Sequence, residues 1–268
     1  KEMDETYPVF AASVKRSYKA FTITVSQTSK VKLESMSAET SAPGMVVSAM
    51  VKVSGNNHLD EVIVSASDGS DKQSIAFTDN TENVYSFSFV MPAHDVIVSF
   101  KTEVGSLIYT FKQFTEISDK KGTYILAKDL ELNNWNKKMI LNGKFYGNGH
   151  TIKYDATGSF RGLFHRIRKN SLLQGLRVVG NVEADEDCAG IAYENQGTIR
   201  DCHFCGRISR VNTPMPSMNR VAAISFSAGK SSLIDHCSAT GELISASNQD
   251  AINKSPLCAQ SDAKKSES

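Results

Sequence analysis

The chain has 268 residues, of which 40% are hydrophobic and 22% are charged, and its formal net charge is +1. This length fits one large domain or two modest ones, with enough apolar residues for a core. The balanced charge does not call for nucleic acid or an anionic membrane as a partner. No apolar run approaches the ~20 residues of a membrane helix, so we expect no membrane span in this chain.

Residues 1–18 are polar and carry mixed charge. We predict that they form a leader or linker. They lack the apolar core of a signal peptide, which is equally true of a mature secreted protein and of a cytosolic one.

Residues 19–104 alternate between apolar and polar side chains, which is the period of a half-buried strand. Turn formers separate the runs, among them Gly55-Asn56, Asp68-Gly69 and Asp79-Asn80. About seven short strands with this spacing predict a β-sandwich-like module. The alternating sets are Phe21, Ile23 and Val25; Val47, Ala49, Val51 and Val53; Val62 and Val64; Tyr85, Phe87 and Phe89; Val96, Val98 and Phe100.

The end of this module resembles a known type of bacterial surface repeat. Residues 85–98 read YSFSFVMPAHDVIV, which is similar to the closing pattern YTFTMPAxDVxV of internalin-type repeats in secreted and wall-attached proteins. The resemblance implies an extracellular spacer and supplies no active site.

Residues 105–246 contain a repeat, which becomes clear when Leu173, Ile199 and Ile234 are aligned. Three positions later stand Leu176, Cys202 and Cys237, and seven positions later stand Gly180, Gly206 and Gly241. Unequal spacing with a fixed internal pattern is typical of solenoid coils with loops of different length. We predict that the apolar triplets stack in the interior and that the glycines occupy equivalent corners with positive φ.

Four segments in this half resemble GLUG-type β-helices, which also occur in the β-helical region of bacterial IgA proteases. They are residues 123–132, 145–152, 162–164 and 189–191, and they follow the order YxLxxDIDL, GxGNGHTI, GLF and AGGI. The resemblance implies a short helix at residues 111–119 that caps the first coil. The predicted fold is all-β: a small β-sandwich-like module followed by a short right-handed parallel β-helix.

Residues 247–268 are predicted to form a polar tail or cap. A fourth unit would place Leu257 at the position of Ile224, but no apolar residue follows near Lys265. An open end of a parallel stack exposes backbone groups. We therefore expect either that the tail folds back over the third unit or that the native protein continues.

The five cysteines are Cys188, Cys202, Cys205, Cys237 and Cys258. Their odd number leaves at least one thiol free or intermolecular, which on its own favours a reducing compartment. Cys202, Cys205 and Cys237 with His203 and His236 could supply zinc ligands. Strand alternation instead turns Cys202 inward and Cys205 outward, so we expect no metal site and a reduced, buried Cys202–Cys237 pair. Buried thiols behave as small hydrophobes and are compatible with an extracellular location too.

The two resemblances together imply an extracellular location, at the cell surface or secreted. We predict a non-catalytic, adhesin-like bacterial module without a cofactor, whose partner is a glycan or a host or cell-surface protein. One alternative is the non-catalytic part of a larger surface protease, since the chain has no His-Glu-x-x-His motif. Another is a β-helix polysaccharide lyase or hydrolase. Hydrolysis needs paired carboxylates, and the outward columns provide none: Arg177, His203 and Ser238, and beside them Gln174, Arg200 and Asp235.

Two segments form the predicted contact surface, because recognition usually resides in loops on a rigid scaffold. The first is the basic turn at residues 165–169, which could meet an anionic glycan. The second is the loop at residues 212–220, whose methionines add adaptable apolar surface. The predicted binding residues are His165, Arg166, Arg168, Lys169, Pro214, Met215, Met218 and Arg220. Trp135 has two interpretations, a sugar platform or packing at the edge of the first coil. The oligomeric state stays open.

Overall fold

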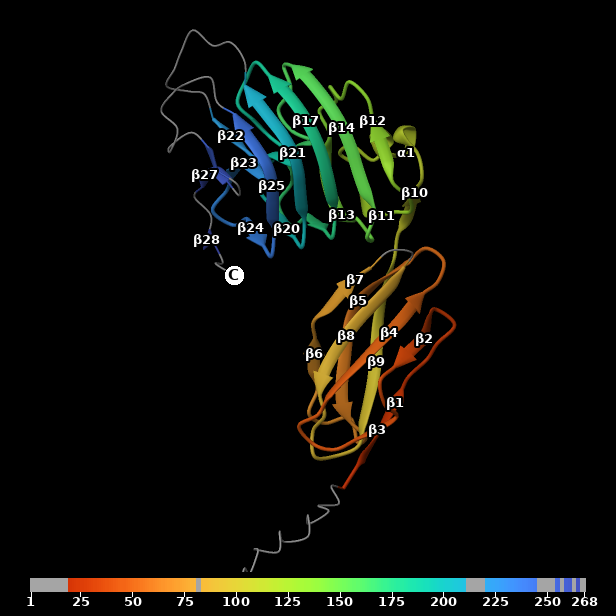
Figure 1. The fold of residues 1–268 in the computed structure, drawn as a ribbon. Helices are drawn as coiled ribbons and strands as arrows, with labels where there is room; N and C mark the ends of the chain where they lie inside the picture. Colours follow the sequence, from red (N-terminus) through yellow and green to blue (C-terminus); the bar gives the residue numbers. More distant parts are fainter. Residues whose placement is uncertain are drawn as a thin grey trace, which may run out of the picture.

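The computed structural model describes residues 19–80, 83–210 and 220–244, together with the backbone of three short strands after residue 250. It confirms the all-β fold, in which a β-sandwich is followed by a parallel β-helix (Figure 1). The predicted leader, residues 1–18, lies outside the described residues. Strands β1 to β9 build the sandwich, and the later strands build the β-helix.

The sandwich packs a five-stranded sheet against a four-stranded one. Neighbouring strands are antiparallel, except that β1 and β9 pair in parallel. The five-stranded sheet has the order β3 (Thr40–Ser41), β1 (Phe21–Val25), β9 (Val96–Val104), β5 (Asn57–Ala66) and β6 (Gln73–Ile75). The four-stranded sheet has the order β2 (Val31–Met36), β4 (Val46–Val53), β8 (Val84–Val90) and β7 (Phe77–Asp79).

The core of the sandwich includes most of the predicted alternating residues, together with Val31, Leu59 and Met91. Val47 and Val51 of β4 and Tyr85 of β8 are fully buried, as are Val62 and Val98 of the opposite sheet. Strand β2 was not visible in the pattern, because its register with β4 shifts between residues 33 and 35 and the shift interrupts the alternation.

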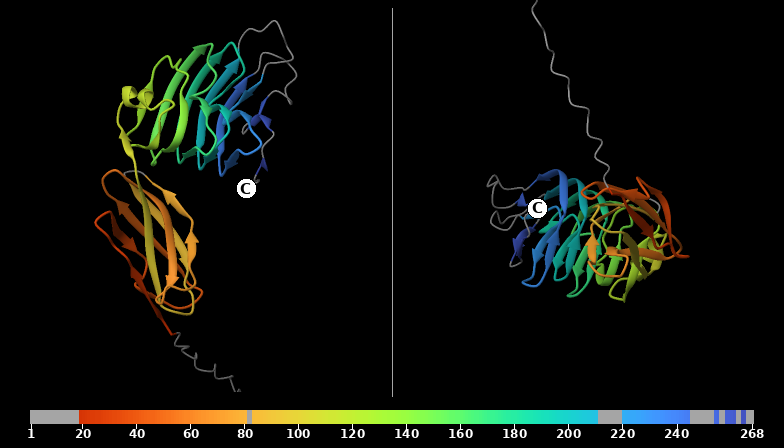
Figure 2. Two further views of the ribbon diagram at one scale, coloured as in Figure 1. Left: turned by 180° about the vertical axis from the view of Figure 1, so that it is seen from behind. Right: turned by 90° about the horizontal axis from the view of Figure 1, so that it is seen from below.

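The β-helix winds through three faces of parallel strands, and its coils stack one beside the next in both views of Figure 2. The first face holds β10 (Ser106–Ile108), β11 (Lys121–Leu126), β13 (Ile140–Tyr146), β16 (Leu172–Gln174), β20 (Thr198–Arg200) and β24 (Leu233–Asp235). The second holds β12 (Leu130–Leu132), β14 (Thr151–Gly158), β17 (Arg177–Ala184), β21 (His203–Arg210) and β25 (Ser238–Ile244). The third holds β15 (Phe164–Ile167), β19 (Ala192–Asn195) and β23 (Ser225–Ala228), with β18 (Cys188–Ala189) and β22 (Val221–Ala222) paired separately.

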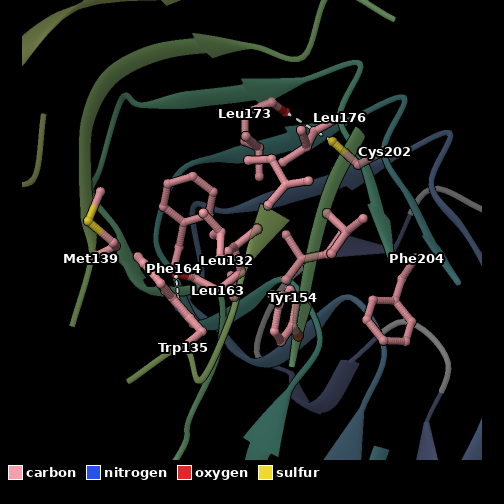
Figure 3. Packing of buried hydrophobic residues seen from close by; sticks show 14 of the residues in the cluster. Leu132, Trp135, Met139, Tyr154, Leu163, Phe164, Leu173, Leu176, Cys202 and Phe204 are labelled. Atoms are coloured by element: carbon pink, nitrogen blue, oxygen red, sulfur yellow. Dashed lines mark hydrogen bonds between the residues drawn. The ribbon is translucent and has the colours of Figure 1, made fainter. Parts of the chain in front are cut away.

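A short helix, α1 (Phe111–Glu116), covers the first coil and is shorter than the predicted segment. Thr110 caps its N-terminus and forms a capping box with Gln113. The buried Phe114 lies 5.7 Å from Trp135, measured between ring centroids. Trp135 is 1% exposed, and its indole N–H donates to the Leu163 carbonyl (Figure 3). It therefore packs at the first coil and offers no exposed platform for a sugar.

The predicted register of the coils is confirmed. Leu173 pairs with Ile199, and Ile199 pairs with Ile234, across neighbouring coils. Cys202 Sγ lies 3.7 Å from the Leu173 carbonyl (Figure 3), and Cys237 Sγ lies 3.6 Å from the Ile199 carbonyl. Cys237 therefore occupies, in the next coil, the position that Cys202 occupies in its own coil.

The glycine triplet is in register, but its predicted place at a corner is wrong. Gly180, Gly206 and Gly241 pair with one another within the long strands β17, β21 and β25. A Cβ on Gly206 would lie 2.0 Å from the Gly180 carbonyl oxygen, and one on Gly241 would lie 1.9 Å from that of Gly206. Glycine is required here because successive backbones approach too closely for a side chain.

After residue 250 the backbone adds further parallel strands. They are β26 (Lys254–Ser255), β27 (Cys258–Ser261) and β28 (Lys264–Lys265), which pair with β22, β23 and β24. The register sets Cys258 opposite Ser225 and Lys265 opposite Ile234. This part of the predicted tail thus extends the stack in the same direction, and Leu257 itself lies outside the described residues.

Candidate binding cleft at the module junction

A buried polar network joins the two modules. The Tyr85 hydroxyl lies 2.9 Å from His58 Nδ1 and donates a 2.8 Å hydrogen bond to Asn148 Oδ1 of the β-helix. Asn148 Nδ2 in turn donates to Asn83 Oδ1 at 2.6 Å. The His58 ring stacks on Tyr146, with 3.7 Å between ring centroids. Buried networks of this kind stabilise one relative arrangement of the groups that form them.

A partly buried carboxylate supports the junction beside this network. Glu103 of β9 accepts hydrogen bonds from Lys144 Nζ at 2.6 Å, from the Tyr146 hydroxyl at 2.9 Å and from Thr123 Oγ1 at 3.0 Å. Desolvation opposes ionisation, but these bonds together hold the pKa of Glu103 below its usual value. The two modules are therefore linked by hydrogen bonds at several points, as well as by the chain between β9 and β10.

One corner of the β-helix faces the junction. It connects the first face to the second, and it contains residues with positive φ: Gly175 (66°), Asp201 (51°) and His236 (48°). Each follows its unit's Leu173, Ile199 or Ile234 by two positions. These are the residue types that adopt a left-handed backbone most readily.

Strand β7 lies against this corner and closes a cleft of about 230 Å³. The lining mixes charged and uncharged polar groups with one aromatic ring. The sandwich contributes Phe77, Thr78 and Asp79, and the β-helix contributes Gly149, Gln174, Gly175, Arg177, Asp201 and His203.

Asp79 of the sandwich lies close to the β-helix in this cleft. A Cβ on Gly175 would lie only 3.4 Å from Asp79 Oδ2. The other carboxyl oxygen, Oδ1, is buried and has no hydrogen-bond partner among the described residues. Burial raises the pKa of Asp79 to about 7, with the charge of Arg177 opposing the rise and that of Asp201 adding to it. A carboxyl group that is protonated near neutral pH can donate a hydrogen bond as well as accept one.

Asp201 and His203 form the β-helix side of the cleft. Partial desolvation raises the pKa of Asp201, although the charges of His236 and Arg200 oppose the shift. His203 Nδ1 lies 2.7 Å from Ser238 Oγ, and its Nε2 lies 3.2 Å from Thr240 Oγ1. These two hydroxyls on β25 orient the imidazole.

The predicted outward column of Arg177, His203 and Ser238 is confirmed by the register of β17, β21 and β25. That column contains no acidic residue of its own. The structure brings Asp79 to it from the other module. No sequence signal marked Asp79, because Asp79-Asn80 has the composition of an ordinary turn.

The predicted basic turn at residues 165–169 is wrong for His165 and Arg166, which lie in strand β15. Both arginines of this segment are ion-paired. Arg166 Nε lies 2.6 Å from Glu194 Oε2. Arg168 donates two hydrogen bonds to the Asp119 carboxylate, at 2.6 and 2.8 Å. Both arginines therefore link neighbouring parts of the β-helix, and a role of this turn in glycan contact stays a prediction.

The other two residues of the basic turn differ in exposure. His165 stacks on Tyr193, with 5.7 Å between ring centroids, and burial lowers the pKa of His165. Lys169 is exposed.

The predicted contact loop is described only at its end. Pro214, Met215 and Met218 lie outside the described residues. Arg220, at the end of the loop, lies 3.1 Å from Asp187 Oδ2, and its guanidinium carbon lies 4.9 Å from the centre of the Phe226 ring. Arg220 therefore anchors this end of the loop to the third face.

The cysteine arrangement agrees with strand alternation. Cys202 is buried and Cys205 is exposed, and Cys188, Cys202, Cys205 and Cys237 are free thiols. In the part of the chain that the structure describes, no three His, Cys, Asp or Glu side chains come together in a group that could hold a metal ion. None of the described helices is long and apolar enough to cross a membrane.

A larger hollow of about 740 Å³ lies on the outer face of the four-stranded sheet. Its lining includes Ser48, Ser86 and Ser88 together with Met50 and Phe87, and it contains no charged residue. Ser48 Oγ and Ser88 Oγ hydrogen-bond to each other at 2.9 Å. Unlike the junction cleft, this hollow has no buried polar atom without a partner, so it is the weaker candidate.

Comparisons with protein-family models, with curated proteins and with solved structures found no match for this chain. The geometry of the junction cleft is therefore the basis for assigning a function.

Proposed function

We propose that the chain is a non-catalytic, adhesin-like bacterial surface or secreted module that binds a glycan in the junction cleft. The observation that carries the proposal is the buried Asp79 Oδ1, which lacks a hydrogen-bond partner among the described residues. Leaving a buried polar group without a partner costs about 1–3 kcal/mol. A bound ligand that supplies the partner recovers this cost, which is a physical reason for the residue to be there.

The size and chemistry of the cleft favour a sugar over a protein segment. Its volume of about 230 Å³ suits one sugar unit better than a large ligand. Sugar hydroxyls both donate and accept hydrogen bonds, as Asp79, Gln174 and His203 require, while Phe77 supplies an apolar surface. A protein partner would need a much larger contact area.

Two resemblances support the surface or secreted location. Residues 85–98 resemble the closing strands of internalin-type repeats, and four segments of the β-helix resemble GLUG-type modules. Both kinds of module occur in bacterial surface proteins. Detection of the protein in the surface or medium fraction of the source cells would test this part of the proposal, and its confinement to the cytosol would contradict it.

A glycan array tests the binding function directly. The wild-type protein should bind a defined subset of glycans, and Asp79→Ala should weaken that binding at least tenfold. Asp185→Ala removes an exposed aspartate from a distant turn and is the matched control, so it should bind like the wild type. Circular dichroism should show that both variants are folded. Absence of any glycan binding, or full binding by a folded Asp79→Ala, would disprove the proposal.

One observation favours a second candidate, a carbohydrate-active enzyme. Asp79 and Asp201 line the same cleft, and the pKa of each is raised by desolvation. Glycoside hydrolysis uses two carboxyl groups, one of them a general acid with a raised pKa. Release of reducing ends from a bound polysaccharide, abolished in both Asp79→Asn and Asp201→Asn, would establish this function. Binding without turnover supports the non-catalytic module.

A further inference from the structure

Arg177 differs from the other arginines of the described part of the chain. Each of the others has an acidic partner within ion-pair distance: Arg161, Arg166, Arg168, Arg200, Arg207, Arg210 and Arg220. Arg177 is exposed at the cleft, and its guanidinium has neither an ion pair nor a hydrogen bond with the described residues. Its five N–H donors are thus available to a ligand.

The free guanidinium lies in the same cleft as the unpartnered carboxyl oxygen of Asp79. The two groups interact electrostatically but form no hydrogen bond with each other. Gln174 and Thr78 add an amide and a hydroxyl to the lining. When Asp79 is protonated, its carboxyl and the guanidinium of Arg177 can therefore both donate hydrogen bonds to one ligand in the cleft.

We propose that the cleft binds a carboxylated glycan, whose carboxylate pairs with the guanidinium of Arg177 and hydrogen-bonds to the carboxyl group of Asp79. The planar fork of an arginine matches a carboxylate in a bidentate geometry. This inference rests on the proposed glycan-binding function and specifies its ligand class.

The charges around Asp79 set the expected pH dependence. Arg177 opposes the raised pKa of Asp79, the negative charge of Asp201 adds to it, and burial raises the pKa of the Tyr85 hydroxyl so that it stays neutral. As the pH rises through about 7, Asp79 ionises, loses its donor and repels the ligand carboxylate. Affinity should therefore fall between pH 6 and pH 8. His203 also lines the cleft, so its contribution is tested separately.

Calorimetric titration with matched ligand pairs tests the ligand class. The acidic probes are sialyllactose and trigalacturonic acid, and their uncharged counterparts are lactose and methyl-esterified trigalacturonic acid. At pH 6 at least one acidic probe should bind ten times more tightly than its counterpart. Arg177→Gln should remove that preference, and Arg177→Lys should retain only part of it because it keeps the charge without the fork. Arg207→Gln, which alters an arginine paired with Glu183 and Glu242, is the control and should bind normally.

A second series assigns the pH dependence to its residue. The affinity of the wild type for the acidic probe should fall at least tenfold from pH 6 to pH 8, and Asp79→Asn should bind with little pH dependence. His203→Gln should keep the wild-type fall, since the proposal places the titrating group on Asp79. If His203→Gln, and not Asp79→Asn, removed the fall, the assignment to Asp79 would be wrong.

The outcomes separate this inference from the proposed function. If uncharged glycans bind as tightly as the acidic ones, or if Arg177→Gln binds acidic glycans normally, the inference fails while glycan binding in the cleft stands. If no glycan binds on the array and no probe binds by calorimetry, the proposed function fails and the inference falls with it.

Discussion

Asp79→Asn should stabilise the protein at alkaline pH, because the native state holds this carboxyl in an unfavourable environment. Burial raises its pKa from an ordinary 3.8 to about 7 in the folded chain. Between these two values the folded state keeps a proton that the unfolded state has released. The stabilising effect of that proton is complete below pH 3.8 and is lost as the pH rises through 7.

The size of the effect follows from the shift. About three pKa units at 1.36 kcal/mol per unit correspond to about 4 kcal/mol. Asparagine has nearly the same shape and does not ionise. The difference in unfolding free energy between Asp79→Asn and wild type should therefore grow by up to about 4 kcal/mol in favour of the variant from pH 4 to pH 8.

Urea unfolding at pH 4, 6 and 8 measures this difference. The value at pH 4 reports mainly the change in packing, because both side chains are neutral in the folded state and the pH-dependent difference is still small there. Asp185→Asn, at an exposed turn, should show almost no pH-dependent difference from wild type. If the stability difference between Asp79→Asn and wild type were the same at pH 4 and pH 8, Asp79 would not be desolvated and the account of the cleft would be wrong.

Three further predictions concern the scaffold. Ile199→Ala, at a fully buried position of the coil stack, should lower the unfolding free energy by roughly 2–5 kcal/mol in urea titrations, and a cost below ~1 kcal/mol would contradict the stacked core. Gly206→Ala should cost more than Gly44→Ala, since both glycines have positive φ but only Gly206 lacks space for a Cβ; equal melting temperatures would show that the close backbone approach is not real. His58→Phe should gain stability relative to the wild type as the pH falls from 6.5 to 4, because burial lowers the pKa of His58 to about 4 and unfolding protonates the imidazole in this range; the same slope in variant and wild type would count against a buried, neutral imidazole.

Much of the fold was predictable because its signals are local. Alternation in β4 and β8 identifies one wall of the sandwich, and the alignment of Leu173 with Ile199 and Ile234 identifies the coils. Strand β2 was missed because a register shift breaks its alternation. The glycine triplet was misplaced because a glycine required by close backbone contact looks the same in sequence as one required by a turn.

The cleft could not be predicted, because it exists only where the two modules meet. Asp79 and Arg177 are far apart in the chain, and each looks ordinary within its own module. The basic turn attracted attention by its charge, but the fold gives Arg166 and Arg168 acidic partners that the sequence does not place beside them. Arg177 stands out as a candidate ligand contact only when the structure shows that, among the described residues, it has no acidic partner of the kind that Arg166 and Arg168 have.

The junction buries two titratable groups, His58 and Asp79, whose effects on the unfolding free energy oppose each other. The pH dependence of the wild-type stability alone therefore would not show either one. Because the pKa of His58 is lowered by two to three units, its contribution decreases the unfolding free energy by about 3 kcal/mol as the pH falls from 6.5 to 4. The contribution of Asp79 increases the unfolding free energy by up to about 4 kcal/mol as the pH falls from 7 towards 3.8. These opposite slopes nearly cancel, so the pair should contribute only about 1 kcal/mol of net pH dependence to the wild type between pH 4 and pH 7. Each single variant should show the pH dependence of the group that remains. The Asp79→Asn protein should become less stable as the pH falls from 7 to 4, and the His58→Phe protein should become more stable. A double variant with the slope of either single variant would show that the two groups do not titrate independently across the junction.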